Sequence, residues 1–309
     1  IAKLNINDNI VSRMILQTSA DKIKISLPER IYLAFSEMGP TFIKLGQVLS
    51  TREDLLPPHY IQTFQKFQDQ AGAISFESIQ KQIEWSLKKP VGECFKSLDP
   101  EPLASASIGQ VHRGELLDGT SVVVKVQRPQ IAQTIEKDLD ILHLLARLAE
   151  KQKIDLIVSP TEIVKEFENA ISEELDFTYE AANLKRFKKN FEGDEKVVVP
   201  TVIESCSSKI VLTMEFIDGV KITDYEKIGC NAEEISKVGT RAVLKQVFDD
   251  GFFHADPHPA NIFVLPGNRI CFLDLGQMGR LSEENREKIV LLMAALARED
   301  RELVANTLY

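Results

Sequence analysis

Three polar side chains near the carboxyl end of the sequence have the types and spacing that phosphoryl transfer requires. Asp256 and Asn261 lie in segment 254–261, and Asp274 follows in segment 272–276. Phosphoryl transfer needs few protein groups: a carboxylate that faces the acceptor, and an amide and a second carboxylate that hold magnesium on the phosphates. Asp256, Asn261 and Asp274 supply these groups in that order. The sequence therefore predicts phosphoryl transfer from a magnesium-bound nucleotide.

The spacing of these residues matches the catalytic loop of protein kinases. In that loop an asparagine follows the catalytic aspartate after about five positions, and an Asp-Phe-Gly triplet comes later. This chain has Asp274, Leu275 and Gly276 where that triplet usually stands. The loop of aminoglycoside and choline kinases is similar, so the loop alone does not separate these relatives.

Two histidines in the same loop have a spacing that also occurs in zinc sites on helices. His254 and His258 are separated as in a His-x-x-x-His motif, but Pro257 and Pro259 interrupt the segment. Proline forbids the helix that such a zinc site needs, so a metal hydrolase is disfavoured. We expect His254 to brace the loop from the core.

A lysine at the end of a β-branched segment is the candidate phosphate ligand. Residues 121–126 favour a strand that contains Lys125, and Asp118 and Gly119 before it favour a hairpin turn. The first arm of the hairpin would be about 109–116. A lone strand lysine is more often a solubilising edge charge, so the assignment of Lys125 depends on the other motifs.

The segment that leads into this hairpin is rich in small side chains. Small residues let backbone amides approach phosphate oxygens, although alanine and serine do not adopt the positive φ angles open to glycine. We therefore expect a nucleotide loop that is stiffer than a glycine-rich one. It consists of Ala104, Ser105, Ala106, Ser107, Ile108 and Gly109.

Acidic residues on a helix expected over 161–191 are candidates for holding the lysine. At about 100° per residue, Asp176 and Glu180 share one face of that helix, while Glu174 points roughly 120° away from Glu180. We expect Glu180 to pair with Lys125. Glu174 is then left to meet a segment that packs on another side.

That segment is expected to be 39–52, which contains Lys44, Gly46 and Gln47. With this motif the chain resembles the UbiB-type, or aarF-domain, atypical kinases. Members of this family share a protein-kinase-like fold and a Lys-x-Gly-Gln signature in a helical extension ahead of it. The other matching positions are the alanine-rich loop 104–109, Lys125, Glu174 and Asp176 as Glu-x-Asp, Glu180, Asp256, Asn261 and Asp274.

The resemblance implies a specific arrangement and activity. The Lys-x-Gly-Gln helices are expected to fold over the active site where a peptide would dock, with Lys44 contacting Glu174. Family members resemble ATPases or small-molecule kinases that use ATP and Mg²⁺, support isoprenoid-quinone biosynthesis and often sit on membranes. The resemblance therefore argues against ordinary protein kinase activity.

Two other functions remain open at this stage. The first is a small-molecule kinase of the aminoglycoside or choline type, which lacks the extension that carries Lys44. The second is a nucleotide-sensing scaffold with vestigial catalysis, which has no need to keep Asp256, Asn261 and Asp274 together. The sequence does not identify the acceptor, which is expected to be a small molecule or lipid-related.

Composition restricts the partners and the compartment. The formal net charge is −9, with 37 basic and 46 acidic residues, which argues against nucleic-acid binding. The four cysteines are widely spread, and no apolar run approaches the roughly 20 residues of a membrane span. We expect a cytoplasmic protein. The absence of an initial methionine indicates a piece of a longer chain, which segments outside this sequence could attach to a membrane peripherally or by an anchor.

The order of elements predicts an α+β, bilobal, protein-kinase-like fold with an N-terminal helical extension and a truncated C-lobe. The expected domains are 1–92, which carries Lys-x-Gly-Gln, 93–216, an N-lobe with inserted helices, and 217–309, a partial C-lobe. Backbone groups of Glu215 and Ile217, between the lobes, would meet adenine.

The expected secondary structure follows hydrophobic periodicity and turn signals. The expected helices are 31–49, 75–87, 130–151, 161–191 and 282–298, the last one amphipathic. The expected strand regions are 95–126, 201–204 and 209–214.

Overall fold

The computed structural model describes residues 25–67, 72–151 and 158–308. Packing divides the chain into two compact units. The first unit consists of Ile1–Gly114 and Val124–Leu175, and the second consists of Glu115–Val123 and Asp176–Tyr309. These units cut across the three ranges expected from motif order, and those ranges stay a prediction.

The helices of the first unit include a break that the sequence analysis missed. The expected helix 31–49 is two helices, because Gly39 adopts φ +102° and Pro40 begins the second one. A proline is accepted at the first position of a helix, where its missing N–H costs nothing. The helices are α2 Leu27–Met38, α3 Pro40–Ser50, α4 Pro58–Phe64, α5 Phe76–Leu87, α6 Ile131–Lys151 and α7 Pro160–Glu174.

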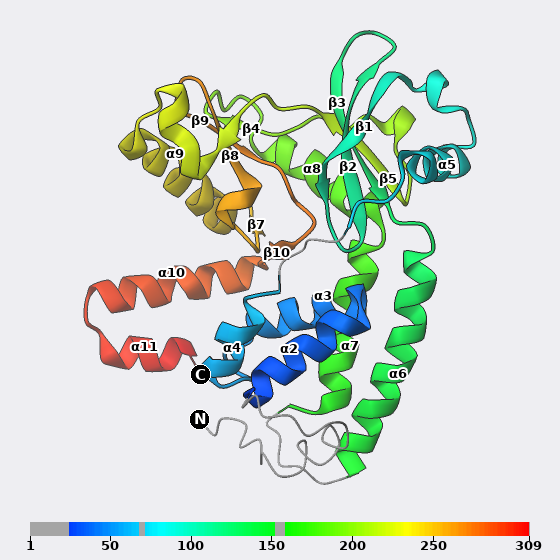
Figure 1. Ribbon diagram of the computed structural model, residues 1–309. Coiled ribbons are helices and arrows are strands. Elements are labelled where there is room, and N and C mark those ends of the chain that lie inside the picture. The colour runs from blue at the N-terminus through cyan, green and yellow to red at the C-terminus, as the bar shows by residue number, and fades with distance from the viewer. Residues whose placement is uncertain (1–24, 68–71, 152–157, 309) are drawn as a thin grey trace. The chain divides into compact units, whose positions relative to one another are not determined.

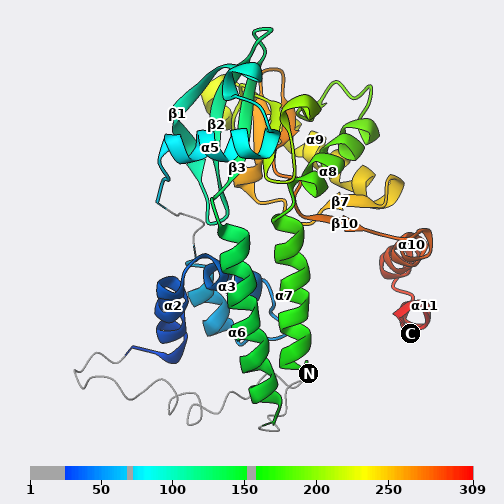
Figure 2. The same ribbon diagram turned by 90° about the vertical axis from the view of Figure 1, so that its right-hand side faces the viewer.

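Helices α3, α6 and α7 share one hydrophobic core. Phe42 and Leu45 of α3 pack with Ile135 of α6 and with Phe167 and Ile171 of α7, and all five side chains are buried. Figures 1 and 2 show α6 and α7 lying side by side over most of their length. This core attaches the Lys-x-Gly-Gln segment to the two long helices.

The expected strand region near the middle of the chain forms three strands. Strands β1 Phe95–Ser105, β2 Gly109–Leu116 and β3 Ser121–Gln127 belong to a sheet of order β1-β2-β3-β5, where β5 is Val211–Glu215. In the β2–β3 turn, Gly119 adopts φ +89° and the Asp118 carboxylate accepts a hydrogen bond from the Thr120 amide. The turn is therefore the hairpin that Asp-Gly favours.

The second unit has short strands packed against helices. Its core contains Leu184 and Phe187 of α8 together with Phe252, Phe272 and Leu275. A four-stranded sheet has the order β4-β9-β8-β6, and β10 pairs with β7. The elements are α8 Phe177–Asn190, α9 Ala232–Leu244, α10 Glu283–Ala297, α11 Arg301–Leu308, β4 Val197–Val198, β6 Val220–Lys221, β7 Phe252–His254, β8 Ile262–Leu265, β9 Arg269–Phe272 and β10 Met278–Arg280.

Short helical turns connect these elements. A π-helix, η4 Lys245–Asp249, continues α9, and such turns often occur at functional sites. The 3₁₀ turns are η1 Val91–Glu93, η2 Glu204–Cys206, η3 Ile222–Ile228 and η5 Pro259–Asn261.

Three further expectations were wrong. The expected helix 161–191 ends at Glu174, and α8 begins at Phe177. The expected strand 201–204 is a single bridge from Val202 to Met214. Helix α10 is capped by Ser282 but is not amphipathic, because apolar side chains are exposed on several of its sides.

Within the part of the chain that the structure describes, no helix is both long enough and apolar enough to cross a membrane.

Candidate active site

Two short strand pairs in the second unit hold the predicted catalytic loop. Strands β7 and β10 are antiparallel, with His254 opposite Met278, and the Ala255 amide donates to the Gln277 carbonyl at 3.0 Å. Asp256 follows directly and is exposed. The ladder therefore ends immediately before the candidate catalytic carboxylate, which leaves its side chain at the surface of the loop.

The second strand pair brings Asn261 and Asp274 to the same hairpin end. Strands β8 and β9 are antiparallel, with Ile262 opposite Phe272. One step beyond this pair, the Leu273 amide donates to the Asn261 carbonyl at 3.0 Å. Asn261 therefore directly precedes β8 and Asp274 lies two residues after β9, so both predicted metal ligands are at the same end of this strand pair.

His254 connects the two halves of this loop. Its side chain is 7% exposed, and its Nδ1 accepts a hydrogen bond of 3.1 Å from the Asp256 amide. Burial lowers the pKa of His254, and the carboxylates of Asp274 and Asp256 partly oppose this effect. The imidazole is therefore neutral near pH 7, with its proton on Nε2, as the acceptor role of Nδ1 requires. The histidine braces the loop from the core, as expected.

Gln246 is a site residue that the sequence analysis missed. It lies on the π-helix η4, is 1% exposed, and its Oε1 accepts a hydrogen bond of 2.9 Å from the His254 amide. Arg286 fixes the end of the same π-helix by donating to the carbonyls of Phe248 and Asp249, at 3.2 and 2.8 Å. No motif in the sequence marks these contacts.

The Asp-Leu-Gly turn is held from both sides. The Gly276 amide donates to Asp274 Oδ1 at 3.0 Å, which orients the carboxylate. Leu275 is fully buried, and its carbonyl accepts a hydrogen bond of 2.9 Å from the Asn183 side chain of α8. A β-carbon at position 276 would lie 3.1 Å from Asp274 Oδ1, so glycine leaves room for this oxygen. Asn183 is a second anchor that the sequence did not reveal.

In the first unit, an arginine holds the predicted nucleotide loop. Ala104 and Ser105 end strand β1, and Gly109 begins β2. Arg128 donates through Nε to the Ala106 carbonyl at 2.8 Å and through Nη2 to Ser105 Oγ at 2.9 Å.

The loop also closes on itself. The Ala106 amide donates to the Gly109 carbonyl at 2.8 Å, and Ser107 and Ile108 are buried. A β-carbon on Gly109 would lie 2.7 Å from the Val126 carbonyl oxygen, so only glycine fits this close approach of two strands. Hydrogen bonds therefore hold the loop as a closed turn, and its stiffness and its contact with nucleotide stay predictions.

Lys125 lies on the less buried face of β3. Val122, Val124 and Val126 are fully buried, and Lys125 alternates with them and is half-buried. Glu180 is 5% exposed on α8 in the second unit. The ion pair between Lys125 and Glu180 stays a prediction.

The contact that the family resemblance implies for the extension is present in the first unit. Lys44 Nζ lies 2.7 and 2.8 Å from the two carboxylate oxygens of Glu174, and the side chains are 14% and 30% exposed. A β-carbon on Gly46 would lie 2.2 Å from the Phe67 ring, so this glycine permits close packing of α3. Gln47 lies on the same helix and is half-buried, and its carbonyl accepts a hydrogen bond from Ser50.

The two acids of Glu-x-Asp do not share a helix, which corrects the face argument made from the sequence. Glu174 is the last residue of α7, and Asp176 caps α8 by accepting from the Thr178 amide at 3.0 Å. Between them, the Leu175 carbonyl accepts a hydrogen bond of 2.6 Å from Gln127, which is 2% exposed. The helix does not continue, because Asp176 has an extended backbone and the Phe177 amide donates to the Lys209 carbonyl at 2.8 Å.

The predicted adenine-contacting segment begins where β5 ends. Glu215 Oε2 accepts hydrogen bonds from the amide and hydroxyl of Thr201, at 3.3 and 2.8 Å. The Phe216 amide donates to the Ser121 carbonyl at 3.0 Å, and Ile217 follows it, half-buried. The contact of Glu215 and Ile217 with adenine stays a prediction.

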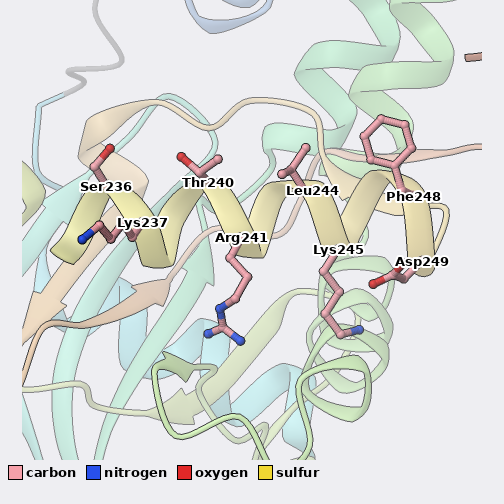
Figure 3. A pocket seen from close by; sticks show the side chains of 8 residues that line it. All are labelled: Ser236, Lys237, Thr240, Arg241, Leu244, Lys245, Phe248 and Asp249. Carbon is pink, nitrogen blue, oxygen red and sulfur yellow. The ribbon is translucent and has the colours of Figure 1, made fainter. Parts of the chain in front are cut away.

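One open cavity in the second unit contains none of the site residues predicted from the sequence. It has a volume of about 740 Å³ and lies along α9 and η4, where Figure 3 shows its lining side chains. Its cations are paired: Lys237 with Glu233, Arg241 with Asp194 and Lys245 with Asp250. We interpret the charged residues that line this cavity as structural ion pairs.

Comparison with known proteins identifies the family and a similar fold. Residues 66–308 match the ABC1 atypical kinase-like domain. A probable protein kinase UbiB of Marinobacter nauticus is 39% identical over 291 residues, which cover 92% of this chain and 53% of the relative. A probable protein kinase UbiB of Aliivibrio fischeri is 38% identical over 289 residues, covering 91% and 53%.

A solved structure is similar in fold. The Rv3197–erythromycin complex from Mycobacterium tuberculosis superposes with a TM-score of 0.63 and 25% identity, covering 90% of this chain and 71% of that one. The chain spans about half the length of the curated relatives it matches. With its α+β architecture and kinase-like order of motifs, this chain belongs to the ABC1 atypical kinase-like family.

Proposed function

We propose that this protein is an atypical kinase or ATPase that binds Mg-ATP. It transfers the terminal phosphoryl group to a small-molecule or lipid-related acceptor, or to water. The observation that supports the proposal is local to the second unit: Asp256 follows strand β7, Asn261 and Asp274 lie at one end of the β8–β9 pair, and the carboxylates of Asp256 and Asp274 act on the pKa of the buried His254. That arrangement has the parts of a phosphoryl-transfer site.

The donor set fits magnesium. Carboxylate and amide oxygens are hard ligands, and Mg²⁺ usually takes one or two carboxylates and completes its shell with phosphate oxygens and water. Asn261 and Asp274 would hold it, and it would neutralise charge on the transferred group. Among the described residues, no group of three or more His, Cys, Asp or Glu side chains could hold a metal ion.

Asp256 is the proposed catalytic carboxylate. Its exposure lets a hydroxyl or water approach it, and the hydrogen bond from its amide to His254 fixes the backbone that carries it. There it would orient the attacking oxygen and take its proton. The other roles in the proposal rest on the sequence pattern. They are those of Lys125 as the phosphate ligand, of Glu180 as its ion-pair partner, of loop 104–109 at the phosphates, and of residues 215 and 217 at adenine.

The acceptor class comes from the relatives. Two of them bear the name UbiB, which supports a role in isoprenoid-quinone or related lipid biosynthesis for this protein. The Lys44–Glu174 contact, which aminoglycoside and choline kinases lack, favours this role over theirs. We include in the proposal a cytoplasmic site of action with peripheral membrane association and no nucleic-acid partner.

Phosphate release in the presence of lipid tests the proposal. The purified protein is incubated with Mg-ATP, with and without liposomes and quinone-precursor analogues, beside Asp256→Asn and Lys125→Ala. We expect phosphate release in the wild type only and weaker nucleotide binding in Lys125→Ala. Nucleotide-dependent thermal stabilisation without turnover under every condition would favour the scaffold. A phosphorylated metabolite from a substrate screen would favour the small-molecule kinase.

A further inference from the structure

Helix α6 is apolar on two sides, and only one of them faces the core. Its buried residues, including Ile135, Leu139 and Leu142, pack against α3 and α7. A second row of large apolar side chains remains exposed at 47–52%. This row, which we call the outer stripe, consists of Ile141, Leu144, Leu145 and Leu148.

The outer stripe has the spacing of a helix–helix interface. Its members follow the pattern i, i+3, i+4, i+7 and fall within an arc of about 100°, whose centre is roughly 130° from that of the buried face. Single exposed leucines are normal, but four on one stripe mark an interaction surface. Figure 1 shows α6 as a long helix beside α7, at the outer side of the helices of the first unit.

Four charged residues lie along one edge of the outer stripe, and their signs follow an order along the helix. Glu136 and Asp140 lie toward the amino end of α6, and Arg147 and Lys151 lie toward its carboxyl end. All four are exposed, and none has an ion-pair partner among the residues that the structure describes. Asp140 and Arg147 are too far apart on the helix to pair with each other, since pairing requires a separation of three or four.

We propose that the outer stripe is a self-association surface, on which a second copy of this chain packs its own α6 antiparallel. A two-fold axis near positions 143–145 places Ile141 against Leu148 and Leu144 against Leu145 of the second copy. The same axis places Asp140 beside the second copy's Arg147. Self-complementary contacts of this kind are what an isologous dimer requires.

The other two charged residues at the edge of the stripe form a second charge pair, one helical turn further from the two-fold axis. With the same axis, Glu136 of one copy lies near Lys151 of the other, so each symmetric dimer contains both charge pairs twice. A parallel arrangement would instead set like charges side by side. The order of charges along α6 therefore selects the antiparallel dimer.

The same charges argue against a lipid surface as the occupant. Helices that lie on anionic membranes carry an excess of Lys and Arg beside their apolar face. The outer stripe has two acids beside it, Glu136 and Asp140, and three bases, Lys137, Arg147 and Lys151, so both signs are present in nearly equal number. A second copy uses both signs, whereas a membrane uses only one.

The dimer is expected to be weak. Four side chains that are each about half exposed bury little area, which puts the interface at the low end of the size range for specific contacts. We expect reversible association at micromolar concentration that weakens as salt rises, because exposed charge pairs are screened.

Charge reversal tests the pairing directly. Sedimentation of the purified chain is measured from about 1 to about 100 μM, the range in which weak interfaces dissociate. We expect Asp140→Arg and Arg147→Asp to be monomeric alone. The double variant Asp140→Arg/Arg147→Asp should dimerise again, and a 1:1 mixture of the two single variants should form heterodimers.

Control variants distinguish loss of the dimer interface from loss of folding. Glu287→Arg makes the same charge change on an exposed position of α10 and should dimerise as the wild type does. Leu144→Gln/Leu145→Gln should be folded by circular dichroism and monomeric. A wild type that stays monomeric throughout, single variants that dimerise normally, or a mixture that stays monomeric would each overturn the proposal. Binding of the monomer to anionic vesicles that Leu144→Gln/Leu145→Gln abolishes would assign the stripe to lipid instead.

Discussion

At the scale of single residues, the loop that carries Asp256 is positioned through its backbone. His254 accepts from the Asp256 amide, and Gln246 in turn accepts from the His254 amide. Both side chains are buried, so each bond satisfies a group that water cannot reach. The proposed catalytic carboxylate thus depends on a glutamine that does not touch it.

Gln246→Leu should destabilise the protein by about 1–3 kcal/mol, because the buried His254 amide loses its acceptor. Urea unfolding monitored by circular dichroism measures this loss. Gln277→Leu, an exposed neighbour, is the matched control and should have little effect. Equal stability of the two variants would mean that the Gln246 hydrogen bond contributes nothing.

Asp274→Asn should weaken the magnesium-dependent part of nucleotide binding by about tenfold or more. Mutation of residues that only orient metal ligands lowers metal affinity by about 10–100-fold, and loss of a ligand should cost at least as much. Thermal shift with ATP, with and without Mg²⁺, measures this part. Asp224→Asn changes a half-buried acid on η3 that pairs with Lys227, outside the predicted site, and should retain the full magnesium effect. A full magnesium effect in Asp274→Asn would place the metal elsewhere.

At the scale of elements, the break between α7 and α8 lets two neighbouring acids serve different partners. Glu174 ends α7 and binds Lys44, whereas Asp176 caps α8 and lies 3.7 Å from Lys209. In one continuous helix these acids would stay on fixed faces. The break therefore frees Glu174 to receive the lysine of α3.

Lys44→Met and Glu174→Gln should each destabilise the first unit by about 1–3 kcal/mol, because each leaves a partly buried charge without its partner. The double variant should lose less than the sum, with a coupling of about 0.5–3 kcal/mol. Urea unfolding of all four proteins completes the cycle. Lys81→Met, in the exposed Glu77–Lys81 pair, is the control and should change stability by less than about 0.5 kcal/mol. Strict additivity would show that the Lys44–Glu174 contact does not couple the helices.

At the scale of the whole molecule, the helical extension is part of a core and does more than cover a surface. Phe42 and Leu45 of α3 bury against Ile135, Phe167 and Ile171 of α6 and α7. Removing the extension would expose these side chains to water. The helical extension that we propose to cover the acceptor site therefore also contributes side chains to the hydrophobic core.

A variant that starts after Lys89 should aggregate or gain promiscuous phosphorylation, because the truncation uncovers this apolar surface and, in our proposal, the acceptor site. Light scattering and phosphate transfer to added substrates measure the two outcomes. A variant that starts at Ile25 keeps α2, α3 and α4 and should behave as the intact chain does. A soluble, folded protein with unchanged activity after the longer truncation would contradict an occluding extension.

The sequence by itself determined what depends on neighbours along the chain. The Asp118–Gly119 hairpin turn, the serine caps of α5 and α10 and the buried valines of β3 follow from turn chemistry and side-chain periodicity. The types and order of Asp256, Asn261 and Asp274 likewise predicted the chemistry, and that order led to the family. Local rules suffice for these features because their partners are only a few positions away.

Only the tertiary structure decided where the helices break and what holds the site. Gln127 binds the Leu175 carbonyl across 48 positions, and Asn183 binds the Leu275 carbonyl across 92. Periodicity predicted one helix over 161–191, but α7 ends at Glu174 and the Phe177 amide donates to the carbonyl of Lys209, more than 30 positions away. Hydrogen bonds of this kind form only when packing closes long loops, so the residues between them carry no local sign of their partners.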